Sequence, residues 1–308
     1  MEVAPCPGSG ACPGRGMSQL RRGQFVTRVA TLAVLIASIL ATAGCTQGDL
    51  RFDGRRAYAH VQAQCDLGPR PAGTAAARAT AKYITEELQR WGWQASYQDF
   101  TYKGVALQNV IGRRGQGGPA VLLGAHYDTR PRADRDPQNP GAPVPGASDG
   151  ASGVAVLLEL ARVLQQSRQP VILAFFDAED QGDLGGWDWA VGSTYMAATL
   201  QDPVTSMVLV DMVGDADQQL YWEANSDVSL RKRLWDVAAE LGYGRQFLAQ
   251  PKYSLMDDHV PFLRRGIPAV DIIDFDYPYW HTTRDTPDKV SAESLERVGR
   301  VLEWWLTR

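Results

Sequence analysis

Acidic residues and histidines follow several apolar segments of strand length in this sequence. The clearest case is the apolar run 171–176, which leads into Asp177, Glu179 and Asp180. Buried carboxylates are costly unless they are paired or bind a metal ion. Because ligands in open α/β sheets bind outside the carboxyl ends of the strands, this cluster indicates a functional site at such an edge.

Other apolar runs end in similar residues. The run 120–125 is followed by His126, the run 207–210 by Asp211, and the run 269–273 by His281 a few residues later. Zinc binds imidazole nitrogen and carboxylate oxygen, and a catalytic zinc ion keeps one position open. Asp149 lies in the segment 145–153, directly before a predicted helix. Together these positions predict a metal site whose candidate residues are His126, Asp149, Glu179, Asp180, Asp211 and His281.

Glu179 and Asp180 are adjacent in the sequence. Neighbouring side chains at the end of a strand point in different directions, so the two carboxylates can have different roles. One can reach the metal while the other faces the substrate, where zinc hydrolases usually place a general base.

Strand and helix patterns alternate along the chain without a repeat or a linker. We therefore expect a single-domain, three-layer α/β/α fold with a mostly parallel central sheet. The predicted strands cover 94–102, 108–112, 120–125, 171–176, 207–211 and 269–273. The predicted helices cover 55–65, 75–91, 150–166, 192–199, 230–241, 258–265 and a last helix capped by Ser291.

A long loop rich in proline, glycine and aspartate covers 130–145. Loops of this length are usually functional or disordered, and we expect Asp134 and Asp136 in it to be solvated. Asp128 and Asp177 are expected to orient metal ligands rather than to bind the metal. His259 is expected to be structural, and a lone His126 is also more typical of a structural histidine.

The N-terminal part of the chain has the pattern of an export signal. Residues 1–44 comprise an extension, a positive segment near Met17 and the short apolar run 29–40. The sequence Thr42-Ala-Gly-Cys45 is similar to a bacterial lipobox, so we expect Cys45 to be lipidated and the protein to be an exported, membrane-anchored lipoprotein of the cell envelope. The alternative is an ordinary signal peptide cut near Ala43. Residues 45–54 would form a tether before a catalytic domain over 55–308.

The bulk composition excludes some classes of partner. There are 31 basic and 35 acidic side chains, giving a net charge of −4, with no block of like charge. We therefore expect no binding to nucleic acid and no membrane contact except through the lipid anchor. The sequence leaves the oligomeric state open. Cys65 is expected to be a packed helix residue without a disulfide partner.

Short motifs give the sequence a family resemblance over 55–306. They are His-Tyr-Asp at 126–128, Ser-Asp-Gly at 148–150, Phe-Phe-Asp-Ala-Glu-Asp at 175–180, Leu-Val-Asp at 209–211, Asp-Asp-His-Val-Pro-Phe-Leu-Arg-Arg-Gly-Ile-Pro at 257–268 and Trp-His-Thr at 280–282. With these motifs the chain resembles the M28 zinc metallopeptidases and, within them, the animal-type glutaminyl cyclases.

The resemblance implies roles for individual residues. Asp149, Asp180 and His281 correspond to zinc ligands, and Glu179 to the general acid and base. Asp180 stands where the family usually has glutamate. The resemblance also implies that Asp211 and Asp257 belong to the catalytic hydrogen-bond network and that Trp280 lines the substrate pocket. From the sequence itself, Tyr277 and Trp187 are further candidates for the pocket wall.

Three functions follow from these assignments. The favoured one is a glutaminyl-peptide cyclotransferase that uses one zinc ion and acts on peptide or protein N-termini. The second is an aminopeptidase, in which His126 and Asp211 would bind a second zinc ion and Asp149 would bridge the two. Ser152-Gly153 after Asp149 is more similar to the aminopeptidases. The third, a binding module without catalysis, is disfavoured because all the ligands are present.

Overall fold

The computed structural model describes residues 51–308, and the predicted signal segment and Cys45 lie outside the described residues. Among the described residues, no helix is both long enough and apolar enough to span a bilayer. Cys65 lies half-buried near the end of the first described helix. Burial raises the pKa of its thiol to about 11, which agrees with a packing role rather than a nucleophilic one.

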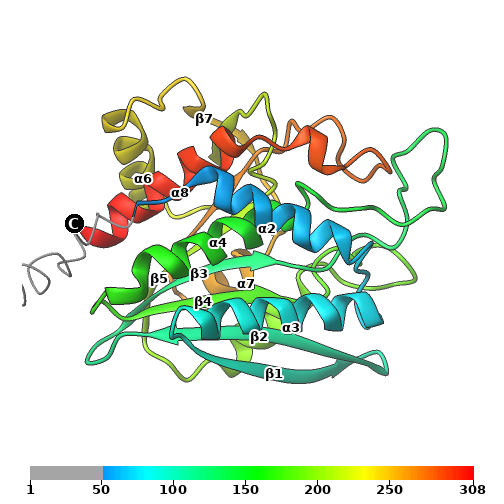
Figure 1. Cartoon of the computed structure of the whole chain (residues 1–308), viewed down its shortest axis with the longest axis horizontal. Helices are drawn as coiled ribbons and strands as arrows, with labels where there is room; N and C mark the ends of the chain where they lie inside the picture. The colour runs from blue at the N-terminus through cyan, green and yellow to red at the C-terminus, as the bar shows by residue number, and fades with distance from the viewer. Residues whose placement is uncertain (1–50) are drawn as a thin grey trace, which may run out of the picture. The chain divides into compact units, whose positions relative to one another are not determined.

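A six-stranded sheet forms the centre of the described domain (Figure 1). The strand order is β1-β2-β4-β3-β5-β8. The four strands β4, β3, β5 and β8 run parallel, whereas β1 and β2 form an antiparallel hairpin beside β4. The mostly parallel sheet is therefore confirmed. The bounds are β1 (Gln94–Tyr102), β2 (Val105–Arg114), β3 (Ala120–His126), β4 (Val171–Phe176), β5 (Val204–Asp211) and β8 (Ala269–Ile273).

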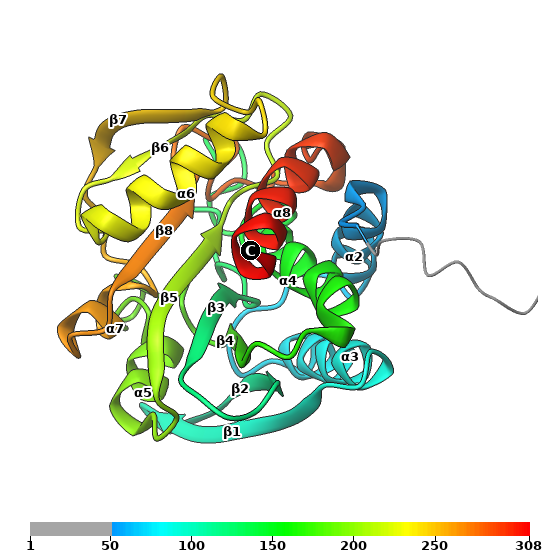
Figure 2. The ribbon, with the colours of Figure 1, turned by 90° about the vertical axis from the view of Figure 1, so that its left-hand side faces the viewer.

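Helices cover both faces of this sheet, which confirms the three-layer architecture (Figure 2). One face carries α2 (Gly54–Asp66), α3 (Ala75–Arg90), α4 (Ala151–Val163) and α8 (Ala292–Thr307), and α6 (Val228–Glu240) packs beside α8. The other face carries α5 (Val191–Thr199) and α7 (Val260–Arg264). In addition, the chain forms short 3-10 turns at Leu164–Gln166 and Pro287–Lys289.

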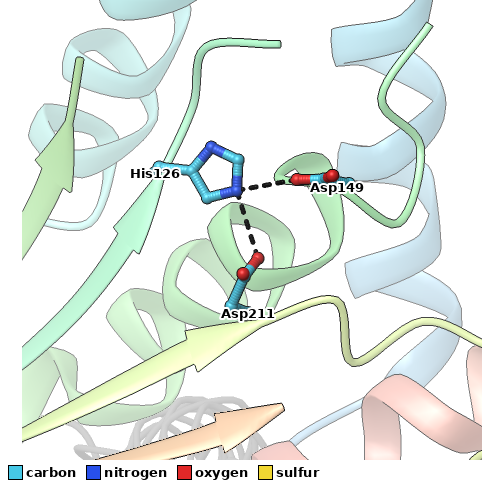
Figure 3. Close-up of side chains that lie close together, drawn as sticks. All are labelled: His126, Asp149 and Asp211. Atoms are coloured by element: carbon cyan, nitrogen blue, oxygen red, sulfur yellow. Dashed lines mark hydrogen bonds and ion pairs between the residues drawn. The ribbon is translucent and has the colours of Figure 1, made fainter. Parts of the chain in front are cut away.

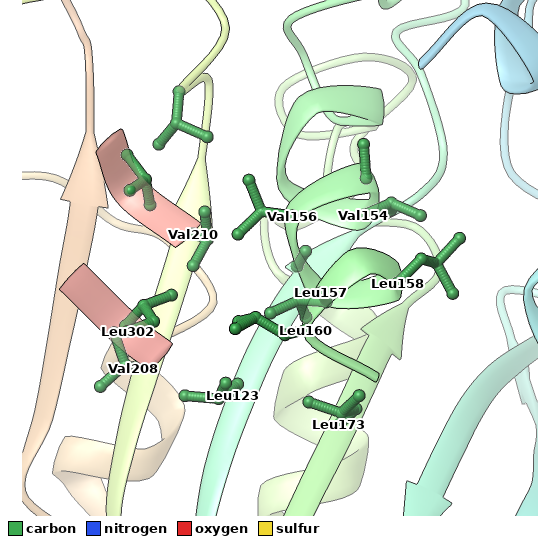
Figure 4. Packing of buried hydrophobic residues seen from close by; sticks show 14 of the residues in the cluster. Leu123, Val154, Val156, Leu157, Leu158, Leu160, Leu173, Val208, Val210 and Leu302 are labelled. Atoms are coloured by element: carbon green, nitrogen blue, oxygen red, sulfur yellow. The ribbon is translucent and has the colours of Figure 1, made fainter. Parts of the chain in front are cut away.

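The central strands are apolar on both faces because both faces are covered. Leu123 and Val208 pack on the α4 side of the sheet (Figure 4). Their neighbours Leu122 and Met207 point to the opposite side, into a second core with Phe262 of α7. Such continuous apolar runs are typical of parallel strands, and every residue of β3 and β4 is buried.

Helix α4 lies very close to β5, and this contact positions the loop that precedes the helix. A Cβ atom on Gly153 would lie 2.1 Å from the carbonyl oxygen of Val210 in β5, so only glycine permits this approach. All residues from Ala151 to Ala161 are buried. Asp149 is therefore fixed directly above the carboxyl edge of the sheet.

The structure adds two strands that the sequence patterns did not predict. β6 (Leu220–Glu223) and β7 (Phe247–Tyr253) form a separate parallel pair. β6 has only four residues, and β7 is mostly exposed and contains Pro251, so neither shows an alternating apolar pattern. The helix expected over 258–265 is shorter and begins at Val260. Ser291 caps α8 as predicted, accepting a hydrogen bond from the Ser294 amide at 3.3 Å.

Candidate metal centre and active site

The carboxyl edge of the sheet gathers the predicted site residues. His126 ends β3, Asp211 ends β5, and the loop after β4 supplies Glu179 and Asp180. Asp149 comes from the loop before α4 and His281 from the segment after β8. All six side chains belong to buried residues, so these parts of the chain, far apart in sequence, form one site.

Asp149 lies between two groups of potential metal ligands. In the first, His126 Nε2 is 3.0 Å from Asp149 Oδ1 and 3.1 Å from Asp211 Oδ1 (Figure 3). In the second, His281 Nε2 is 3.1 Å from Asp180 Oδ1 and 3.8 Å from Asp149 Oδ2. Each oxygen of Asp149 thus faces a different histidine, and the donor atoms of each group lie within 4.8 Å of one another.

Asp180 gives the strongest sign that the second group binds a cation. Its side chain is 1% exposed, and neither carboxylate oxygen accepts a well-formed hydrogen bond from the described residues, although His281 Nε2 and an Arg130 nitrogen lie 3.1 and 3.5 Å from Oδ1. Buried polar groups normally have such partners, and a metal ion takes the place of the missing donor. Burial, together with the charge of Asp149, raises the pKa of Asp180 to about 6. The donor set therefore fits a divalent metal ion, and zinc accepts this combination of imidazole and carboxylate ligands.

The site also contains an excess of buried acidic groups. Burial, increased by the negative charge of Asp257, raises the pKa of Glu179 well above its usual range. Burial likewise raises the pKa of Asp211 to about 7. Two histidines and Arg130 face this set of carboxyl groups, and a divalent cation would further reduce the repulsion between them.

Two further aspartates hold the ligand loops in place. Asp128 accepts hydrogen bonds from the amides of Glu179 at 3.0 Å and Asp180 at 3.2 Å, which agrees with its predicted orienting role. Asp285 accepts from the amides of Ser148 at 2.8 Å and Asp149 at 3.1 Å. Asp285 is not among the residues predicted from the sequence, because it lies in a short irregular segment without an apolar strand before it.

Asp177 lies next to the site but does not contact a ligand. Its carboxylate accepts a hydrogen bond from the Gln108 amide at 3.0 Å, and its own amide donates to Asn109 at 3.0 Å. It therefore joins the end of β4 to β2, and the expectation that it orients a metal ligand is wrong. His259 is structural as expected: it is fully buried, with Nε2 3.1 Å from Glu223.

The loop over 130–145 contacts the site through some of its residues, although much of it is exposed. Arg130 donates two hydrogen bonds to Asp134, at 2.8 and 2.7 Å, and Asp134 Oδ1 lies 3.4 Å from His281 Nδ1. Asp136 is 5% exposed and accepts a hydrogen bond from the Thr283 amide at 3.0 Å. The expectation of a solvated side chain is therefore wrong for Asp136, which has partners in the segment that carries His281, whereas the Asp134 side chain is 36% exposed as expected but also contacts Arg130 and His281.

Asp134 is placed to orient His281, and this gives a first prediction. The hydrogen bonds from Arg130 lower the pKa of Asp134, so the carboxylate is charged where it faces the imidazole. Carboxylates of this kind typically contribute about 10–100-fold to metal affinity. Asp134→Ala is expected to weaken zinc binding by about that factor. Competition with a chromogenic chelator measures it.

The matched control for this prediction is Asp202→Ala. Asp202 also forms a close pair with an arginine, at 2.9 Å. Its partner is Arg113 on β2, away from the ligand residues. It should leave zinc affinity unchanged. Equal affinities for Asp134→Ala and the unmodified protein would show that the loop does not support His281.

A cavity of about 220 Å³ opens onto these residues. Glu179, Asp211 and Asp257 lie on its polar side, and Trp189 and Trp280 form aromatic walls. The volume is small enough to limit the site to one substrate side chain and its amino group. Glu179 is thus next to the metal ligands and to the space for the substrate.

The three predicted pocket aromatics lie in different places relative to this cavity. Trp280 lines the cavity as predicted, but Tyr277 is buried away from it and donates a hydrogen bond to Asp285 at 2.7 Å. Trp187 lies in a neighbouring groove, and Trp189 occupies the predicted place on the cavity wall. The loop after β4 turns irregularly, so position in sequence did not distinguish these two tryptophans.

Backbone strain is concentrated at this edge of the sheet. Ala178, Met212 and His281 have positive φ values of 60°, 43° and 57°. Such conformations cost about 1–3 kcal/mol each and are frequent at functional sites. Ala178 and Met212 turn the chain just after β4 and β5, and His281 has the same kind of conformation in the segment after β8, next to the cavity.

Comparison with known proteins agrees with this geometry. The model of the protein family described as Peptidase family M28 matches residues 109–305 of this chain. A glutaminyl-peptide cyclotransferase of Drosophila melanogaster is 27% identical over 275 residues, which cover 77% of this chain and 76% of the fly protein.

Two solved structures are similar in fold. Glutaminyl cyclase of Porphyromonas gingivalis is 35% identical with a TM-score of 0.79, over 84% of this chain and 99% of that one. A Zn-dependent exopeptidase of Parabacteroides distasonis is 32% identical, also with a TM-score of 0.79, over 84% and 99% of the two chains.

The fold and the site together define an enzyme of the zinc exopeptidase class, and the predicted fold class is confirmed. The chain belongs to peptidase family M28.

Proposed function

We propose that this protein is a glutaminyl-peptide cyclotransferase, which converts an N-terminal glutamine into pyroglutamate and releases ammonia. The main support is the small aromatic cavity, in which Glu179 lies beside the ligand group Asp149, Asp180 and His281. Relatives named as glutaminyl cyclases occur both among similar sequences and among similar folds. The substrates would be peptides and proteins with a free N-terminal glutamine.

The metal in this proposal is one zinc ion held by Asp149, Asp180 and His281. When bound, zinc supplies Lewis-acid polarisation of the side-chain amide carbonyl. Dialysis against a strong chelator is expected to abolish activity, and added zinc to restore it. Full activity in a preparation verified as metal-free would contradict the zinc assignment.

Glu179 would carry the proton in this reaction. The α-amine of the substrate attacks the side-chain amide carbon, so a carbon–nitrogen bond forms and the bond to the departing nitrogen breaks. Glu179 accepts the proton that the amine loses and returns it to the leaving ammonia, and no water is consumed. Burial raises the pKa of Glu179, which makes its carboxylate a stronger proton acceptor than a solvated glutamate.

The cavity walls would contribute by holding the reacting groups together. Trp189 and Trp280 restrict the space around the substrate side chain and exclude water. Because the amine and the amide belong to the same glutamine, the walls would act by holding its side chain in the bent conformation that brings the amine against the carbonyl carbon. Asp257 and Asp211 complete the polar side of the cavity, where they would orient the amine and influence proton transfer by Glu179.

The direct test offers the purified protein matched Gln- and Leu-peptides and measures pyroglutamyl peptide, ammonia and free amino acid. We expect pyroglutamyl peptide and ammonia from the Gln-peptide and little free leucine from the Leu-peptide. Rapid release of leucine without cyclisation would reject the cyclase assignment.

One observation favours a second candidate function, an aminopeptidase with two zinc ions. Both oxygens of Asp149 face histidines, so His126 and Asp211 could bind a second ion there. A metal analysis of active protein distinguishes the two cases. One zinc ion per chain supports the cyclase, whereas two ions together with hydrolysis of Leu-peptides would support the aminopeptidase.

We also propose that the protein is exported and anchored to the cell envelope through a lipid on Cys45. The support is the lipobox-like sequence Thr42-Ala-Gly-Cys45 after a short apolar run. Cys45→Ser should shift the protein from the membrane fraction to the soluble fraction of the producing bacterium. Retention of the variant in the membrane fraction would exclude this anchor.

A further inference from the structure

A second and larger hollow adjoins the catalytic cavity. It is a groove of about 530 Å³ between the end of β1, helix α5 and the loop after β4. Trp189 and Met256 line both the groove and the catalytic cavity, so the two spaces meet along these two side chains. The mechanism described above uses no residue that belongs to the groove alone.

The groove exposes apolar and aromatic surface that a soluble protein normally covers. Five large apolar residues are exposed in the described part of the chain, and two of them, Tyr195 and Met256, line this groove. The Tyr195 ring stacks on Phe100 with centroids 4.6 Å apart and planes at 13°. The surface is therefore already ordered, and clusters of exposed apolar side chains commonly mark binding sites.

Trp189 forms a fixed boundary between the groove and the cavity. Its ring stacks against His281 with centroids 6.1 Å apart, and the Arg130 guanidinium lies 4.9 Å from the ring centre. A Cβ atom on Gly182 would lie 2.0 Å from the same ring, so the indole packs directly on the backbone there. A ligand that leaves the cavity therefore passes a rigid aromatic edge before it reaches the groove.

We propose that this groove binds the second and third residues of the peptide substrate and favours apolar or aromatic side chains there. The inference rests on the proposed function. The catalytic cavity, at about 220 Å³, has room for one residue, so the rest of a peptide must lie outside it. An extended chain advances about 3.3–3.6 Å per residue, so the residues directly after the first lie close to the shared wall.

A matched pair of peptides tests the proposal. Gln-Phe-Ala and Gln-Gly-Ala differ only in the side chain that would enter the groove. We expect kcat/KM to be about tenfold higher for Gln-Phe-Ala, because a phenyl ring buries apolar surface there. The difference should appear in KM with similar kcat values, since the groove binds substrate and transition state equally.

Two variants connect this preference to the groove. Tyr195→Ser removes an aromatic wall, and Ala198→Trp fills the space from α5; both should remove most of the preference by raising KM for Gln-Phe-Ala. Tyr97→Ser is the control, because Tyr97 is also an exposed tyrosine, 43% exposed on β1, but lies outside the groove. It should keep the tenfold preference.

The outcomes separate this inference from the proposed function. If neither peptide is cyclised, the proposed function fails. If both peptides are cyclised with equal kcat/KM, or if the groove variants keep the preference, the groove assignment is wrong. If Tyr195→Ser instead changes the molecular mass in solution and leaves the preference intact, the groove is a contact between copies of the chain and the inference is overturned.

Discussion

Replacing Glu179 with glutamine is expected to lower kcat for cyclisation by about 10²–10⁴-fold while zinc binding and folding are unchanged. The amide has nearly the same shape as the carboxylate but cannot accept the proton from the substrate amine. Glu179 lines the cavity and belongs to neither group of potential ligands, so the metal should remain. Steady-state kinetics with a Gln-peptide, combined with metal analysis, measures both effects.

Glu87→Gln is the matched control for this variant. Glu87 is also a buried glutamate whose pKa is raised by burial, but it lies on α3 beside Arg90 and away from the cavity. It should leave kcat unchanged. A decrease of less than about tenfold for Glu179→Gln would place the base elsewhere, with Asp211 and Asp257 on the same cavity as the next candidates.

His281→Ala is expected to lose bound zinc and, with it, essentially all activity. The imidazole is the only nitrogen donor in the ligand group with Asp149 and Asp180. Without it, Asp149 and Asp180 lose the one imidazole that faces both of them, which also weakens the site. Metal analysis after gel filtration, with circular dichroism as a check on folding, gives the result.

His60→Ala is the control for the histidine replacement. His60 lies on α2, where Nδ1 is 2.6 Å from the Tyr83 hydroxyl, and it belongs to neither ligand group. This variant should retain zinc and activity. If His281→Ala also keeps its zinc and its activity, the ligand group with Asp149 and Asp180 is not the catalytic metal site.

The sheet and the position of the site could be predicted from the sequence for a specific physical reason. Parallel strands covered on both faces are apolar throughout, so 171–176 and 269–273 have clear ends, and β4 and β8 match them residue for residue. Charged residues directly after such runs must lie at the carboxyl edge. This is how residues as distant in sequence as His126 and Asp211 could be assigned to one site.

Other features depend on contacts between distant parts of the chain and have no local pattern. Asp134 and Asp285 support the ligand loops through partners that only the fold brings near, Arg130 and His281 for the first and Asp149 for the second. Both look like ordinary loop aspartates in the sequence. The β6–β7 pair was missed because its strands are short or exposed.

The most direct test of cyclisation follows the side-chain nitrogen of the substrate. A Gln-peptide is prepared with a heavy nitrogen isotope in the side-chain amide, and the products are separated and analysed by mass spectrometry. Cyclisation with Glu179 as the proton carrier predicts that all of the label leaves as ammonia, while the peptide keeps its length as a pyroglutamyl product. Labelled free glutamine together with a peptide shortened by one residue would contradict it and show hydrolysis instead.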